Sequence, residues 1–357
     1  IIQQLNRKLA MKNTILVNRN AIYRKNNFIC VGTFKKYPIY MGIDKLSFVS
    51  KIIPAEEFWG VYKKFDKLKQ VRSGKYEICS IKVKHYRCGI KITSMKNPDF
   101  YLLLSYDFPR KLNEPRVRFE LSPQYAKNRD IPNVIKWLKK HIGVEVIDML
   151  LQTSRVTRID LTLDVHSKRF LRNYYFSIPN ARTGRNFLGN EDDCKNNYAI
   201  GSQRSSSYLL VYEKLKFQEV EDVYQNNLIV KREHIKRSIT RLELRIKPPY
   251  QQPLFLSEVS MLENPFSRIL IYRRNKIASQ FKDFLPYIKE EKSIPLAVKS
   301  YLQAKVDDDT KVNRNLRLKT NRCLEKCKSK FILNIDWSKY PDIIDNSIGY
   351  FTQTSLR

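Results

Sequence analysis

The chain has 357 residues, 42% of them hydrophobic, which is enough to bury the core of one large domain and a smaller one. Its 67 Lys and Arg against 35 Asp and Glu leave a net charge of +32, so the expected partner is a polyanion, with nucleic acid ahead of an anionic membrane. No apolar run approaches the roughly 18 residues of a membrane span, and residues 1–10 lack the apolar stretch of a secretion signal, so a cytoplasmic protein with no membrane partner is expected.

Alternating apolar and polar residues predict a series of β-strands in the first two thirds of the chain. The predicted strands are Lys45–Ser50, Tyr76–Ser94, Phe100–Phe108, Arg116–Ser122, Val156–Val165, Tyr198–Gly201, Tyr208–Lys214 and Ile239–Lys247. Helical spacing occurs between them at Ile131–Ile142, Glu145–Leu151 and, more weakly, Asn226–Arg237. This pattern predicts an α+β fold with a mostly antiparallel central sheet and flanking helices.

After Pro248 and Pro249 the pattern becomes helical. Helices are predicted at Leu256–Leu262, Pro265–Phe284 and Ile294–Ala304. Lys311–Lys330 carries eight Lys or Arg in twenty residues, which suits a helix lying against phosphate and equally a solvated charged face.

Cysteine and histidine offer little to a metal site. The six cysteines are scattered without the spacing of a zinc site, so free thiols are expected. The four histidines include no His-x-His pair. A nuclease metal in this chain would therefore be held by carboxylates.

Three predicted strands share one feature on their polar faces: an Arg two residues before a carboxylate. The pairs are Arg118 with Glu120, Arg158 with Asp160, and Arg241 with Glu243. If these strands share one sheet, Glu120, Asp160 and Glu243 could converge within a basic surface, as a divalent cation site requires. The alternative is cross-strand pairing of Arg with carboxylates that only stabilises a solvated face. The pattern leaves both interpretations open.

A fourth predicted strand places Tyr208, Tyr212 and Lys214 on one face. Tyrosine is common in strands for packing reasons, and the chain has 21 of them. The pattern by itself does not single out Tyr212.

Three stretches, in this order, resemble the signatures of a known family: Val156–Asp164 (VTRIDLTLD), Tyr198–Lys214 (YAIGSQRSSSYLLVYEK) and Thr240–Lys247 (TRLELRIK). The family is the replication initiation factor (Rep_trans) family of rolling-circle plasmid and phage initiators and related relaxases of conjugative elements. Ile43–Phe48 and Arg118–Pro123 resemble two further strands of that family, so the resemblance covers about residues 40–250. In the turn, Gln203 stands where the family usually has Arg, and Arg204 follows it.

The resemblance implies a DNA-nicking enzyme with Tyr212 as nucleophile, forming a 5′-phosphotyrosine and a free 3′-hydroxyl that primes synthesis. It implies that Glu120, Asp160 and Glu243 hold Mg²⁺ or Mn²⁺, while Asp164 is an outer ligand or holds an Arg in place. The candidate phosphate contacts are Arg158, Arg204, Lys214 and Arg241. The same site could rejoin the strand after one round of replication.

The resulting expected organisation is a basic N-terminal segment (1–39), a catalytic domain (40–250) and a helical basic region (251–357) with a candidate role in origin recognition. Expected partners are origin DNA, a host helicase, a host DNA polymerase and, from the resemblance, a second copy of the chain. The helicase must come from the host because the chain has no Walker-type phosphate-binding stretch. The alternatives are a conjugative relaxase with the same chemistry, a noncatalytic basic DNA-binding protein and, with less support, an RNA-binding protein.

Overall fold

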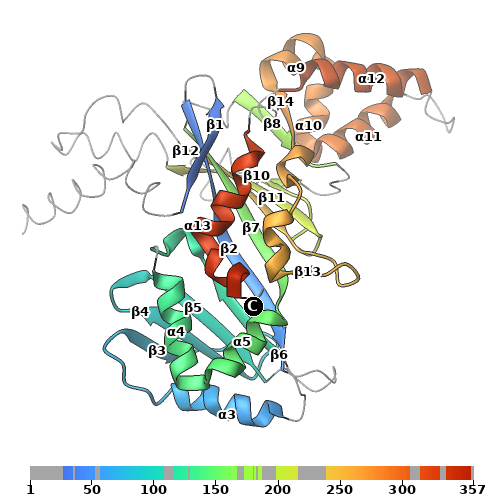
Figure 1. Ribbon diagram of the computed structural model, residues 1–357. Coiled ribbons are helices and arrows are strands. Elements are labelled where there is room, and N and C mark those ends of the chain that lie inside the picture. Colours follow the sequence, from blue (N-terminus) through green and yellow to red (C-terminus); the bar gives the residue numbers. More distant parts are fainter. Residues whose placement is uncertain are drawn as a thin grey trace, which may run out of the picture.

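The computed structural model describes residues 27–34, 37–52, 57–107, 116–127, 129–166, 173–179, 181, 184–186, 198–215, 239–305, 314–329 and 335–354. These residues form an α+β fold in which helices flank a large twisted sheet (Figure 1). Every pairing between the named strands of this part of the chain is antiparallel. The predicted fold class is confirmed.

The main sheet has twelve strands among the described residues, in the order β3-β4-β5-β6-β2-β7-β12-β11-β10-β9, with β1 added to β2 and β13 added to β7. The strands are β1 (Ile29–Phe34), β2 (Tyr37–Lys51), β3 (Tyr76–Ser80), β4 (Cys88–Ser94), β5 (Asn97–Tyr106), β6 (Arg116–Leu121), β7 (Arg155–His166), β9 (Gly184–Asn186), β10 (Tyr198–Ile200), β11 (Ser207–Leu215), β12 (Ile239–Ile246) and β13 (Leu254–Phe255). The long strands β2 and β7 lie side by side at the centre and join the two halves of the sheet.

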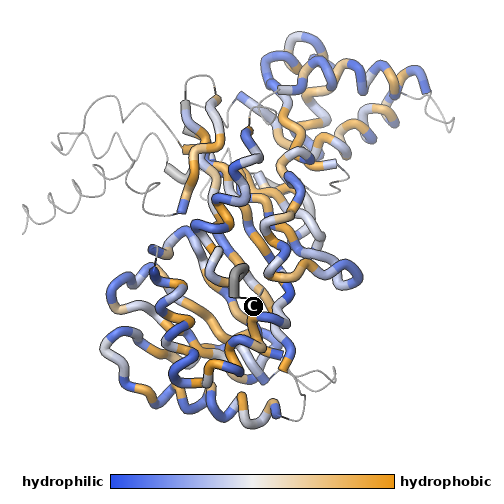
Figure 2. Tube along the Cα trace, viewed as in Figure 1, coloured by the Kyte–Doolittle hydropathy of each residue, from blue (hydrophilic) through white to orange (hydrophobic). Residues whose placement is uncertain are grey.

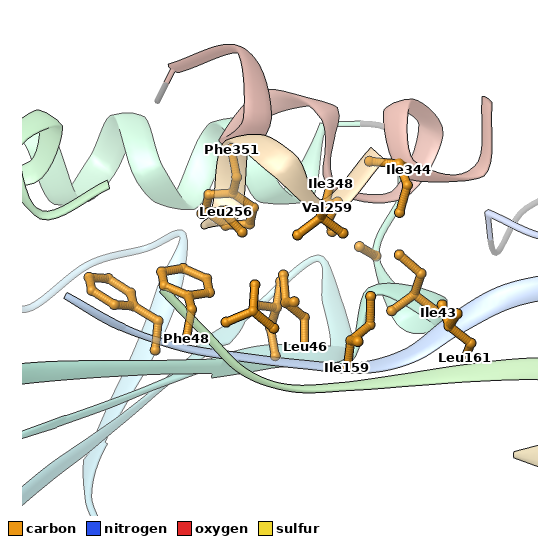
Figure 3. Close-up of a cluster of buried hydrophobic side chains, with 14 of the residues drawn as sticks. Ile43, Leu46, Phe48, Ile159, Leu161, Leu256, Val259, Ile344, Ile348 and Phe351 are labelled. Carbon is orange, nitrogen blue, oxygen red and sulfur yellow. The ribbon is translucent and has the colours of Figure 1, made fainter. Parts of the chain in front are cut away.

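One face of the sheet is apolar and covered by helices. The covering elements are α3 (Phe58–Leu68), α4 (Asp130–Ile142), α5 (Val144–Gln152), the 3-10 turn η3 (Leu256–Met261) and α13 (Tyr340–Thr354). Figure 3 shows Ile348 and Phe351 of α13, with Val259 of η3, facing Leu46 of β2 and Ile159 of β7. Hydrophobic residues accordingly concentrate along the central strands and on the inner sides of these helices (Figure 2). Burying this face supplies most of the driving force for folding.

The region after residue 250 is divided between two cores. Leu256, Val259 and residues of α13 pack into the core of the main sheet. A second cluster forms around Tyr272, Phe284 and Leu324. It draws on β8 (Tyr174–Ser177), β14 (Leu270–Arg273), α9 (Arg274–Gln280), η5 (Lys282–Phe284), α10 (Leu285–Glu291), α11 (Ile294–Ala304) and α12 (Arg314–Cys327). Hydrophobic packing therefore crosses the predicted boundary at residue 250.

Most predicted elements occur close to their predicted bounds. Two predicted elements, one strand and one helix, each correspond to several shorter elements in the structure. The predicted strand Tyr76–Ser94 is two strands, β3 and β4, because the chain reverses at a Val83–Tyr86 bridge with His85 at φ 71°. The predicted helix Pro265–Phe284 contains η4 (Pro265–Arg268), β14, α9 and η5, since the apolar run at Leu270–Arg273 pairs with β8. The predicted helix Leu256–Leu262 is the 3-10 turn η3. The predicted helix Asn226–Arg237 lies outside the described residues.

The length and hydropathy of the helices determine whether any of them could cross a membrane. Across the described part of the chain, no helix combines the length and the apolar character that a bilayer crossing requires.

Candidate functional site

The face of the sheet opposite the helices is polar at its centre. On β7, the alternation that turns Ile159 and Leu161 toward the helices turns Asp160, Thr162 and Asp164 to the other face, where all three are fully buried. In the antiparallel register with β12, Arg245 lies opposite Asp160 and Arg241 lies opposite Asp164. The register therefore lines up buried carboxylates of one strand with cations of the next.

Three carboxylates converge on this face: Asp44, Asp160 and Glu243 each offer one oxygen, and the three oxygens all lie within 4.8 Å of one another. Asp160 and Glu243 are two of the three predicted metal ligands. The third member, Asp44 of β2, was absent from the predicted set. Hard oxygen ligands at this spacing suit Mg²⁺ or Mn²⁺.

Asp44 reaches the group through a β-bulge. Ile43 pairs with Leu161 and Lys45 pairs with Asp160, so Asp44 is an extra residue between two consecutive ladder pairs. The sequence carries a signal for this bulge, because apolar residues alternate through Met41 and Ile43 and then resume one position late at Leu46. The bulge lets Asp44 and Lys45 both lie near the polar face while Ile43 and Leu46 stay in the core.

Glu120, the other predicted ligand, lies apart from the three-carboxylate group. It is on β6, forms an ion pair with Lys45 and accepts a hydrogen bond from Arg118 at 2.8 Å. In the sheet order β2 lies between β6 and β7, so a residue of β2 is closer to Asp160 than any residue of β6 can be. The structure therefore groups Asp44, in place of Glu120, with Asp160 and Glu243.

The electrostatics of the group favour a bound cation. Burial, together with the negative charges of Asp44 and Asp160, raises the pKa of Glu243 to about 7, although Arg245 and Arg241 act in the opposite direction. Burial is the largest cause of this shift, and the two guanidinium groups offset only part of the effect of burial and of the repulsion from Asp44 and Asp160 on Glu243. A divalent cation among Asp44, Asp160 and Glu243 would remove that repulsion.

Tyr212 lies beside this group. Its hydroxyl donates a hydrogen bond to Oε2 of Glu243 at 3.3 Å. Burial raises the pKa of the Tyr212 hydroxyl, Arg241 lowers it, and Glu243 raises it further. The hydroxyl is therefore neutral at pH 7 and has a carboxylate within reach to accept its proton.

Arg241 is one of the most buried charges on this face, with a side chain only 2% exposed. It donates to both oxygens of Asp164 at 2.6 and 2.7 Å, and through Nη1 to Asp44 and to Gln124, each at 3.1 Å. Gln124, in the 3-10 turn η2 (Pro123–Tyr125), also donates to Asp44. Arg241 was predicted to contact phosphate, but its donors point into the protein. Asp164 holds this Arg in place, which is one of its two predicted roles.

The remaining predicted phosphate contacts lie at different places. Arg158 is 21% exposed and donates from Nε to Asp160 at 2.8 Å. Arg204 is exposed in the turn between β10 and β11, where Gly201 adopts φ +88°. Lys214 is on β11, and its side chain lies outside the described structure. Of these residues, the structure brings Arg158 next to the carboxylate group.

A scan against known protein families finds no family that matches this chain, and a search of curated proteins finds no significant match. The resemblance to the replication initiation factor family therefore stays a prediction.

Proposed function

We propose that this protein nicks one strand of DNA by transesterification, with Tyr212 as nucleophile, and so initiates rolling-circle replication. The observation that carries the proposal is the hydrogen bond from the Tyr212 hydroxyl to Glu243, a member of the three-carboxylate group. A neutral tyrosine is a weak nucleophile, and this arrangement supplies both a proton acceptor and a place for a cation. The net charge of +32 favours a polyanionic substrate.

In the proposed reaction, the Tyr212 oxygen forms a bond to the scissile phosphorus while its proton passes to Glu243. The bond from phosphorus to the 3′-oxygen breaks, and that oxygen takes a proton from solvent to become the free 3′-hydroxyl. Asp44, Asp160 and Glu243 would hold Mg²⁺ or Mn²⁺, which, when bound, stabilises charge on the phosphate oxygens. Because one phosphoester replaces another, the same residues can run the reverse step and reseal the strand without ATP.

Arg241 has a structural role in this mechanism. Its contacts with Asp164, Asp44 and Gln124 fix the position of Asp44. Its positive charge also lowers the pKa of Tyr212, against the larger effect of burial. It therefore assists formation of the phenolate without touching the substrate.

A noncatalytic DNA-binding protein is the rival proposal, and one observation favours it. Both oxygens of Asp160 accept hydrogen bonds from Arg158 and from Arg245, which is the arrangement expected if the carboxylates only stabilise the sheet. This rival predicts salt-sensitive DNA binding with no covalent product.

A conjugative relaxase would share the chemistry and differ in whether the nick leads to copying or to transfer of the DNA.

The decisive experiment incubates the protein with supercoiled DNA of the element that encodes it, in Mg²⁺ or in EDTA, and detects protein joined to a 5′ end on denaturing gels. Wild type and Tyr101→Phe, a control on distant β5, should form the adduct in Mg²⁺. Tyr212→Phe and the EDTA samples should not. Binding by every sample without adduct or relaxation would favour the noncatalytic rival, and an adduct formed by Tyr212→Phe would show that another tyrosine is the nucleophile.

A further inference from the structure

A band of positive charge crosses the polar face of the sheet beside the three-carboxylate group. Its members, which we call the cationic band, are Lys45 of β2, Arg118 of β6, Arg158 of β7, Arg245 of β12 and Lys247, the residue after β12. Four of them, Lys45, Arg118, Arg245 and Lys247, were not singled out as phosphate contacts from the sequence. They come from strands that are far apart in the chain and adjacent in the sheet.

The register aligns the band. Ile246 pairs with Ile159, so Lys247 follows at the level of Arg158. Arg158 in turn lies opposite Ser47, and the Oγ of Ser47 accepts a hydrogen bond from Arg118 at 3.0 Å. Neighbouring strands are about 4.8 Å apart, so the band spans roughly 14 Å from β12 to β6. Two of its members, Arg158 and Arg245, both contact Asp160 of the three-carboxylate group.

The band carries more positive charge than its carboxylates neutralise. Its ion-pair partners among the described residues are mainly Asp160 and Glu120, with Glu243 at 3.6 Å from Arg245. Lys247 has no carboxylate within ion-pair distance in the part of the chain that the structure describes, and its Nζ donates to the carbonyl oxygen of Gln203 at 2.5 Å. Partial burial lowers the pKa of Lys247, and the like charges of Arg245 and Arg158 lower it further. An anion in the band would relieve this repulsion.

The side chains of the band are partly exposed to solvent. The side chains of Arg118, Arg158 and Arg245 are 32%, 21% and 14% exposed. Arg241, in contrast, is sealed in the interior on the same face.

We infer that the cationic band binds the phosphodiester backbone of single-stranded DNA next to the phosphate that Tyr212 attacks. The inference rests on the proposed function for the position of the reacting phosphate. The band crosses four adjacent strands, from β12 through β7 and β2 to β6, so the backbone of one strand can follow it across the sheet. Exposed guanidinium and ammonium groups contact successive phosphates without reading bases, so the band aligns the strand and does not select its sequence.

The test measures binding of a fluorescein-labelled oligothymidylate to the full chain in EDTA at several salt concentrations. All variants carry Tyr212→Phe, so that no chemistry contributes. Lys247→Gln should weaken binding several-fold at low salt and reduce the slope of log K against log salt by about 0.7, the value for one phosphate contact on a single strand. Arg118→Gln should have a similar effect. Lys247→Arg should restore binding because it keeps the charge.

The control is Lys67→Gln, which removes one exposed lysine from α3 on the helical side of the sheet. It should leave the slope unchanged. The band does not bind single-stranded DNA if Lys247→Gln and Arg118→Gln leave the affinity and the salt slope unchanged, as Lys67→Gln should. The same conclusion follows if they weaken only the binding of a duplex of equal length. This result is independent of the adduct assay. DNA binding by the band can be contradicted while Tyr212 still forms an adduct, and adduct formation by Tyr212 can be contradicted while the band still binds DNA.

Discussion

The hydrogen bond between Tyr212 and Glu243 is a diagonal contact across two strands. In the register of β11 with β12, Tyr212 lies opposite Arg241, and Glu243 lies opposite Leu210. The long tyrosine side chain spans the diagonal and places its hydroxyl 3.3 Å from the carboxylate of Glu243. The directly opposite Arg241 turns its guanidinium to Asp164 instead. Tyr212 and Glu243 therefore form one pair, which the proposed reaction uses. Arg241 and Asp164 form a separate pair, which holds the site together.

Glu243→Gln tests Glu243 as proton acceptor and cation ligand. The variant should form the covalent adduct roughly 10²- to 10⁴-fold more slowly, in the range for loss of a general base. It should not lower the melting temperature at pH 8, because the charge it removes is buried beside Asp44 and Asp160 and costs stability. Rapid-quench adduct formation and thermal melting measure the two effects. Wild-type adduct kinetics in this variant would rule out the role.

The pKa of Glu243 sets a pH dependence. In the folded protein this pKa is about 7, above the ordinary value of 4.5, so between these values the native state holds a proton that the unfolded state has released. Without a metal, stability should therefore fall as pH rises from about 4.5 to 7. Mg²⁺ affinity should rise over the same window, because the cation needs the ionised carboxylate. Urea unfolding and calorimetric titration across this range are the measurements, with Glu243→Gln as the variant that should flatten both profiles.

Asp44 and Glu120 give a matched comparison of metal ligands. Asp44→Asn should weaken Mn²⁺ binding by more than about tenfold, because it removes one of the three grouped oxygens. Glu120→Gln should have a much smaller effect, since Glu120 pairs with Lys45 and Arg118. Electron paramagnetic resonance of bound Mn²⁺ reads both affinities directly. The reverse order would restore the ligand set predicted from the sequence.

Gln124→Leu should act on the metal through Asp44. Gln124 bridges Asp44 and Arg241, and its loss frees Asp44 to move away from the group. We expect Mn²⁺ affinity to fall by roughly 10-fold, within the range for residues that orient a metal ligand. Gln124→Glu keeps the acceptor for Arg241 but loses the donor to Asp44, so it should not restore affinity. Unchanged affinity in both variants would show that Asp44 is positioned without Gln124.

Arg241→Leu should be strongly destabilising, by about 3–5 kcal/mol, because it leaves Asp164 charged and buried without its cation. Replacing both residues, as Arg241→Met with Asp164→Leu, should recover much of that loss. Arg317→Leu, at an exposed position of α12, should change stability by less than about 0.5 kcal/mol. Urea denaturation of the four proteins measures these differences. Equal stability of Arg241→Leu and Arg317→Leu would contradict the buried ion pair.

The sequence predicted the fold class and most strands because each strand carries its own alternation, as in Val156–Val165. The polar faces of the strands predicted that Asp160 and Glu243 could converge, and the resemblance added Tyr212 to them. It did not predict Asp44 or the separation of Glu120, because both depend on the order of strands in the sheet. Alternation reports which face a residue occupies and not which strand lies beside it. Gln124 was missed for a related reason, since a residue in a short 3-10 turn has no periodicity to place it.

The contacts of Arg241 also bear on how the protein is made. They join residues separated by 77, 117 and 197 positions in the chain, Asp164, Gln124 and Asp44. While the ribosome is still translating the residues before position 241, the carboxylates of Asp44 and Asp164 have no cation from β12. Contacts of such long range close long loops, which costs entropy and slows folding. The candidate site therefore cannot form until β12 has been made, and a chain released earlier would also lack the strand that joins β11 to β7 in the sheet.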